Sequence, residues 1–203
     1  MKNSAALKIN APQLTTVVEK KRISKPLITV ADFELWQSKR TLEYNYEFYH
    51  GKIIKKEPTK QNELLIYQIL LEFFLKTKAF ANRGLLFAEA DAPIDDFRKR
   101  IPDISFYTRA QVLEAQKIGN RVTTTFAIEI LSDSETTVHI ETKIQDYFDA
   151  GVLVVWYIHP KTQKIYVYTS PNDVKIYHGD MIVNAKPALD DFEFPVKALF
   201  ETN

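Results

Sequence analysis

The chain has 203 residues, of which 45% are hydrophobic and 12% aromatic, so it can bury a full core within one domain. It contains no cysteine, which excludes a disulfide framework and thiolate metal sites. Apolar runs are too short to span a membrane and no secretory signal opens the sequence, so we expect a cytoplasmic protein without a membrane partner.

The net charge of +1 conceals an asymmetry between the N-terminus and the rest of the chain. Residues 1–25 carry six basic residues and one acidic residue, a net charge of +5, which leaves −4 on the remainder. This segment shows little hydrophobic periodicity, so we predict a flexible leader (1–25) before one domain (26–203). The basic leader could help hold a phosphate backbone, and a solvated leader without a partner is the alternative.

The first half of the domain begins with a helix that a threonine caps, TVADFELWQS at 29–38. Aromatic and β-branched residues around His50-Gly51 then predict a hairpin over 46–55. Residues 62–78 form the longest predicted helix. Its apolar residues lie on nearly all sides, so we expect it to be largely buried.

The second half alternates predicted strands with one further helix. Strands are expected at 85–94 and 101–107, joined by the polar turn DDFRKR, and a central strand at 126–131. A helix at 140–150 should end at Gly151. Three more strands are predicted at 152–158, 164–169 and 174–177. This order indicates an α/β fold in which helices flank a mixed β-sheet.

Glu129 interrupts the apolar strand FAIEIL at 126–131. Alternation places it on one face with Ala127, whereas Phe126, Ile128 and Ile130 share the other face. A buried carboxylate is costly unless a cation or hydrogen-bond donors meet it, and such groups concentrate at functional sites. Pairing with a structural lysine or arginine is the alternative.

Asp103 and Lys143 are the other candidates for chemistry. Asp103 follows a proline at the start of a predicted strand, where a solvent-facing polar residue would also be ordinary. Helical spacing places Lys143 beside the buried stripe of its helix, so it either reaches toward the sheet or remains a solvated lysine with a packed stem. Two carboxylates on neighbouring strands with a lysine nearby suit Mg²⁺, which would stabilise charge on a phosphodiester undergoing hydrolysis.

The order of these motifs resembles nucleases of the PD-(D/E)XK superfamily, and within it a bacterial restriction endonuclease family. The resemblance covers about residues 28–200. It is carried by these motifs in order: YEFYHGKI, PDISF, EILS, KIQDYFDAGV, VWYIHP and DDFEFPVKALF. It implies a restriction-endonuclease-like fold and Mg²⁺-dependent cleavage of DNA, with Mn²⁺ able to substitute.

The resemblance also implies roles for four residues. Asp103 and Glu129 would hold the metal, and Lys143 would serve the attacking water. Glu47 matches an acidic residue of the first hairpin and would add an outer ligand, although a half-exposed strand residue is the alternative there. The superfamily's Glu-x-Lys would place lysine at 131, where this chain has Leu131.

Three segments depart from the family's pattern. Relatives have histidine where this chain has Gln61-Asn62-Glu63, aspartate near His159-Pro160, and proline in place of Asp133. The four histidines show no metal-ligand spacing and are interpreted as structural or surface residues. We therefore predict an endonuclease, expected to be a homodimer because cutting both strands usually needs two sites. The alternatives are a catalytically silent binding module with the same fold and a carboxylate-pair hydrolase such as a glycosidase.

Overall fold

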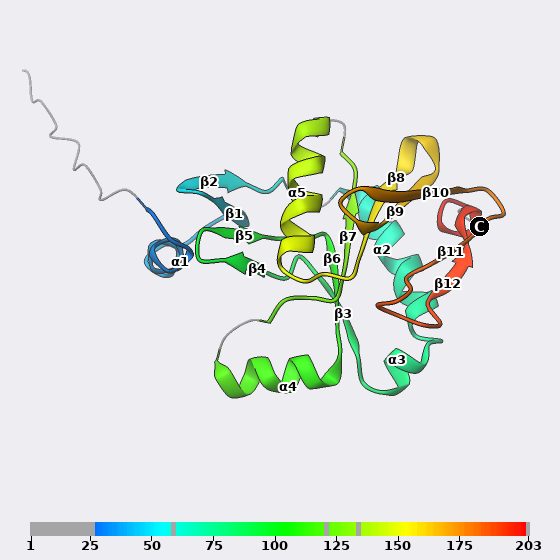
Figure 1. Cartoon of the computed structure of the whole chain (residues 1–203), viewed down its shortest axis with the longest axis horizontal. Coiled ribbons are helices and arrows are strands. Elements are labelled where there is room, and N and C mark those ends of the chain that lie inside the picture. Colours follow the sequence, from blue (N-terminus) through cyan, green and yellow to red (C-terminus); the bar gives the residue numbers. More distant parts are fainter. Residues whose placement is uncertain (1–26, 58–59, 120–121, 133–134, 202–203) are drawn as a thin grey trace, which may run out of the picture.

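The computed structural model describes residues 27–57, 60–119, 122–132 and 135–201, and within them the strands form three sheets (Figure 1). The predicted leader therefore lies outside the described residues. A four-stranded antiparallel sheet has the order β2-β1-β5-β4, a six-stranded sheet has the order β10-β9-β8-β7-β6-β3, and β11 pairs with β12. The bounds are β1 Tyr46–Tyr49, β2 Lys52–Lys55, β3 Leu85–Ala88, β4 Ala92–Asp95, β5 Arg98–Arg100, β6 Ile104–Tyr107, β7 Phe126–Ile130, β8 Val154–His159, β9 Lys164–Ser170, β10 Asp173–His178, β11 Ile182–Asn184 and β12 Glu193–Pro195.

The six-stranded sheet is the mixed sheet that the sequence predicts. Its β7 and β8 are parallel, and its other neighbouring pairs are antiparallel. All five residues of β7 are buried, as expected for a strand covered on both faces. Phe126, Ile128 and Ile130 join one apolar cluster and Ala127 joins another, which confirms the predicted alternation.

Two helices cover opposite faces of this sheet (Figure 1). Helix α5 (Thr137–Asp149) connects β7 to the parallel β8 and packs Ile144 and Tyr147 against one face. It begins three residues before the prediction because the Thr136 side chain caps it. It ends before Gly151, whose φ of 89° is the left-handed conformation that glycine favours.

Helix α2 (Gln61–Phe74) covers the other face but is shorter and less buried than predicted. Ile66, Leu70 and Phe74 enter the core at a spacing of four residues, whereas Leu64 remains 55% exposed. The chain then turns, and Thr77 caps the separate helix α3 (Lys78–Ala81). The expectation that this helix is largely buried was wrong, because α2 packs against the sheet along one stripe.

The prediction of one strand over 85–94 and a turn at DDFRKR was also wrong. Residues 85–88 and 92–95 are two strands, β3 and β4, which belong to different sheets. The second half of the predicted turn is strand β5, and Lys99 and Arg100 within it are buried. Both side chains form ion pairs with carboxylates inside the fold, so the charged residues of this segment did not indicate exposure to solvent.

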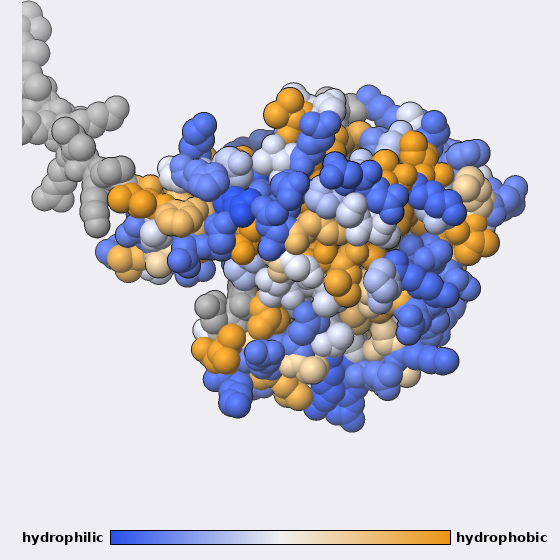
Figure 2. Space-filling view, in the orientation of Figure 1, coloured by the Kyte–Doolittle hydropathy of each residue, from blue (hydrophilic) through white to orange (hydrophobic). Residues whose placement is uncertain are grey.

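The remaining elements complete the molecule. Helix α1 (Val30–Ser38), with its Thr29 cap, and the β1–β2 hairpin are as predicted. Helix α4 (Arg109–Ile118), β11, β12 and the short 3₁₀ helices at 160–162 and 196–199 were not predicted. Figure 2 shows hydrophilic residues over β2 and apolar patches over α4, where Leu113 and Ile118 are exposed. No helix of the described segments is long and apolar enough to cross a membrane.

Candidate active site

The strand register brings Asp103 and Glu129 to the same end of the six-stranded sheet. Asp103 immediately precedes β6, which pairs antiparallel with β7 through Ile104 and Ile128. The backbone N–H of Ile130 donates to Asp103 Oδ2 at 2.6 Å, which ties that side chain to the strand carrying Glu129. Both predicted metal ligands therefore line one pocket of about 650 Å³.

Glu129 is 1% exposed and receives two donors from α5. Lys143 Nζ donates to Oε2 at 3.1 Å, and the Tyr147 hydroxyl donates to Oε1. Burial raises the pKa of Glu129 to about 7 despite the opposing effect of Lys143, and nearby Asp103 raises it further. An additional cation beside Glu129 would favour its ionised form and so oppose the rise in its pKa. The contact with Lys143 also fits the alternative of a structural ion pair.

Lys143 is buried in the sheet-facing surface of α5, so the interpretation of a solvated lysine was wrong. Its ammonium lies between Glu129 and Glu135, with Nζ 3.5 Å from Glu135 Oε1. Burial alone would lower the pKa of Lys143, but the surrounding carboxylates outweigh it and raise the pKa above its ordinary value. Lys143 therefore keeps its proton and acts as a donor.

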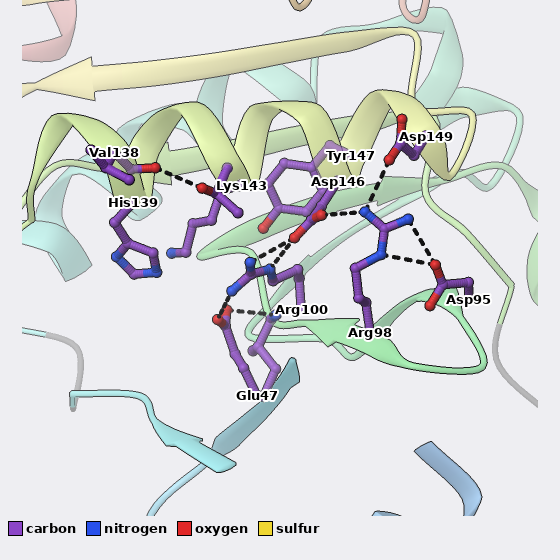
Figure 3. A network of polar contacts seen from close by, with 12 residues as sticks. Glu47, Asp95, Arg98, Arg100, Val138, His139, Lys143, Asp146, Tyr147 and Asp149 are labelled. Atoms are coloured by element: carbon purple, nitrogen blue, oxygen red, sulfur yellow. Dashed lines mark hydrogen bonds and ion pairs between the residues drawn. The ribbon is translucent and has the colours of Figure 1, made fainter. Parts of the chain in front are cut away.

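Glu47 belongs to a buried ion-pair network rather than to a half-exposed strand surface (Figure 3). Its Oε2 accepts from Arg100 Nη1 at 2.9 Å, and its Oε1 accepts from the backbone N–H of Ile101 at 3.1 Å. Arg100 also donates to Asp146 of α5 at 2.7 Å. Burial opposes ionisation of Glu47, but Lys143 and Arg100 prevail and lower its pKa. The network fixes the small sheet against the helix that carries Lys143.

Lys56, which the sequence reasoning missed, is a second ammonium in the pocket. It follows β2, and its Nζ lies 2.7 Å from Asp103 Oδ1 and 3.0 Å from the carbonyl oxygen of Ile101. Burial alone would lower the pKa of Lys56, but Asp103 and Glu129 raise it. No signal in the sequence indicated this role, because Lys56 follows β2 and its neighbours Ile54 and Lys55 line the same pocket, so alternation does not single it out.

The pocket's donor set fits a hard divalent cation. Mg²⁺ needs only one or two carboxylates because it keeps several waters, and Asp103 and Glu129 supply two. Glu135 Oε1 is buried and accepts no hydrogen bond from the described residues, although the Lys143 ammonium lies 3.5 Å away, so this oxygen can still accept a hydrogen bond from a water bound to the cation. Across the described segments no three His, Cys, Asp or Glu side chains gather closely enough to form a metal cage of their own.

Among the histidines and the segments that depart from the family's pattern, His139 and Glu63 line this pocket. His139 lines it, 3.8 Å from Glu135, so its position goes beyond the structural or surface role expected of the histidines. His159 stacks on Tyr166 with ring centroids 4.2 Å apart. The side chain of Asn62 and all of Asp133 lie outside the described residues.

Comparisons with known proteins agree with this fold. A family model described as "Uma2: Putative restriction endonuclease" matches residues 30–197. A crystal structure of a protein described as a putative nuclease belonging to DUF820, from Anabaena variabilis ATCC 29413, superposes with a TM-score of 0.72 at 20% identity. The match covers 86% of this chain and 98% of that chain, which confirms the predicted fold class. No curated protein matches this sequence.

Proposed function

Because the chain belongs to the Uma2 family of restriction-endonuclease-like proteins, we propose that it is an endonuclease that hydrolyses DNA phosphodiester bonds with Mg²⁺, or Mn²⁺ in its place. One observation carries the proposal: two carboxylates from adjacent strands and a buried lysine from the following helix face the same pocket. Hydrolysis of a phosphodiester requires positive charge that stabilises the transition state and a positioned nucleophile, and this arrangement can provide both.

Asp103 and Glu129 are the residues that would hold the cation. When bound there, a divalent ion supplies Lewis-acid stabilisation of phosphate charge and a more acidic water. The hydrogen bond from Ile130 N–H orients Asp103, and Tyr147 orients Glu129, so the protein positions both carboxylates in advance. Glu47 would support the site without binding the cation directly, because Arg100 and the backbone N–H of Ile101 already donate hydrogen bonds to its two oxygens.

Lys143 has three N–H donors and no acceptor, so it can orient the attacking water and bind a phosphate oxygen. Its position between Glu129 and Glu135 limits how far the ammonium can move. The chain thus contributes a charged donor at the place where negative charge would increase during hydrolysis. Cutting both strands of a duplex would further require two such sites, for which we propose a homodimer.

A catalytically silent binding module is the second candidate, and a specific observation favours it. Asp103 and Glu129 each already have a lysine partner, Lys56 and Lys143, so the fold balances these charges with its own side chains. A glycosidase would leave both lysines without a role, because its substrate is neutral. The silent module would bind nucleic acid or another partner without cutting it.

Nicking of supercoiled plasmid DNA with Mg²⁺ or Mn²⁺ tests the choice between them. Asp103→Asn and Glu129→Gln should abolish nicking and also the rise in melting temperature that Mn²⁺ causes in the wild type, while circular dichroism stays unchanged. If both variants, purified in parallel with the wild type, cleave DNA at the wild-type rate, then Asp103 and Glu129 do not form the catalytic site. A wild type that binds DNA but never cuts it would establish the silent module. Sedimentation velocity separately measures whether a homodimer exists.

A further inference from the structure

Each oxygen of Asp103 already accepts a hydrogen bond from the protein, but the two donors are of different kinds. Oδ2 accepts from the backbone N–H of Ile130, a contact built into the pairing of the two strands. Oδ1 accepts from the Lys56 ammonium at the end of a side chain with four rotatable bonds. The Oδ1 contact is therefore the one that can be exchanged without disturbing the sheet.

We propose that Lys56 competes with the divalent cation for Asp103 Oδ1 and so lowers the cation affinity of the pocket. The inference rests on the proposed function, because it takes Asp103 as a cation ligand. An ammonium 2.7 Å from Oδ1 and a divalent ion on the same oxygen would repel each other strongly in a poorly solvated pocket. The cation can bind Asp103 fully only when Lys56 moves away.

The position of Lys56 is built by the fold and is not that of a surface lysine in chance contact. Its side chain is 12% exposed, and its backbone N–H donates to the Asn45 carbonyl at 2.9 Å, which fixes the chain where β2 ends. The carbonyl of Ile101 accepts a second hydrogen bond from the ammonium. Burying an ammonium is costly unless it is paired, and these two acceptors offset that cost.

Competition at Asp103 has a reciprocal consequence. If Lys56 lowers the affinity for the cation, then the cation weakens the hold of Asp103 on Lys56 by the same factor. A displaced Lys56 remains tethered at the pocket rim, where its ammonium is free to bind a phosphate oxygen. Cation binding and capture of an anionic substrate would therefore be coupled through this one side chain.

Titration calorimetry with Mn²⁺ on the full chain, freed of metal with EDTA and dialysed, tests the proposal. Lys56→Met keeps the length of the apolar stem and removes the charge, so Mn²⁺ should bind at least tenfold more tightly than to the wild type. Lys52→Met is the matched control, because Lys52 is an exposed lysine of β2 that does not line the pocket, and the Mn²⁺ affinity of this variant should stay within twofold of the wild type. Adding Asp103→Asn to Lys56→Met should abolish the gain.

Each outcome decides between the two proposals. Equal or weaker Mn²⁺ binding by Lys56→Met, with a wild type whose binding depends on Asp103, would overturn the role of Lys56 and leave the proposed function standing. Absence of Mn²⁺ binding from both proteins would overturn both. Binding by Lys56→Met alone would support the competition and explain a silent wild type. If Lys56→Met fails to fold, Lys56→Gln replaces it, because its neutral amide can still donate to Asp103 and should tighten Mn²⁺ binding in the same direction.

Discussion

Arg100→Met should lower the free energy of unfolding by about 3 to 5 kcal/mol, because removing one partner of a buried ion pair leaves the other charges uncompensated. Arg100 is 1% exposed, and its partners Glu47 and Asp146 are 3% and 1% exposed. Methionine retains the packing of the aliphatic stem but supplies no charge, so it also loses the contact of the guanidinium with the Tyr49 ring. The predicted loss therefore comes from Glu47, which loses its ion-pair partner, and from Asp146, which keeps only Arg98, rather than from a cavity.

Urea unfolding followed by tryptophan fluorescence measures this loss, because Trp156 is fully buried in the main core. For a domain of about 200 residues, 1 kcal/mol corresponds to roughly 2–4 °C, so the melting temperature should fall by about 6 to 20 °C. Arg98→Met is the control. Two of its three carboxylate partners, Asp95 and Asp149, are more than one third exposed, so it should cost only about 1 kcal/mol.

A triple variant separates the charge effect from any loss of packing. Arg100→Met combined with Glu47→Gln and Asp146→Asn removes the charges of both former partners, while Arg98 keeps Asp95 and Asp149, and should recover at least half of the lost stability. The reasoning is refuted if Arg100→Met costs less than about 1 kcal/mol, or if the triple variant is no more stable than the single one.

Three further predictions concern the site and the leader. Lys143→Ala should lower the single-turnover cleavage rate far more than it changes Mn²⁺ affinity, and unchanged turnover would reduce Lys143 to a packing residue. Deleting residues 1–25 removes five net positive charges, so the affinity for DNA should fall and its salt dependence flatten, as filter binding at several salt concentrations would show. Because the pKa of Glu47 lies below its ordinary value of 4.5, its contribution to stability is present above that pH and lost as the pH falls through the depressed pKa. Glu47→Gln should therefore flatten the loss of stability below about pH 4.5, and urea midpoints that decline as steeply as those of the wild type would contradict this.

The elements that the sequence predicted are those whose signal is local. Thr29 and Gly151 mark helix ends through backbone hydrogen bonding and conformation within a few residues. The alternation around Glu129 correctly predicted which residues of β7 share a face. Side chains alternate between the two faces of a strand whatever its neighbours are, so this pattern is local. The helical spacing of Lys143 likewise pointed it toward the sheet, where it contacts Glu129.

The elements that were missed depend on partners distant in the chain. In the sequence, Arg100 lies in a segment typical of a polar turn. It can occupy a buried strand only because Asp146, 46 residues later, accepts a hydrogen bond from its guanidinium. The run 85–94 divides between two sheets because its halves pair with different strands, which local propensity does not encode.

The candidate site divides in the same way. The sequence by itself indicated which carboxylates could meet, because Asp103 and Glu129 lie in two successive predicted strands, but the register that places them opposite each other was set by the fold. Only the tertiary structure decided what surrounds them. Lys56 reaches Asp103 across 47 positions of sequence, and whether that ammonium or a metal ion neutralises the carboxylate depends on distances that only the folded chain sets.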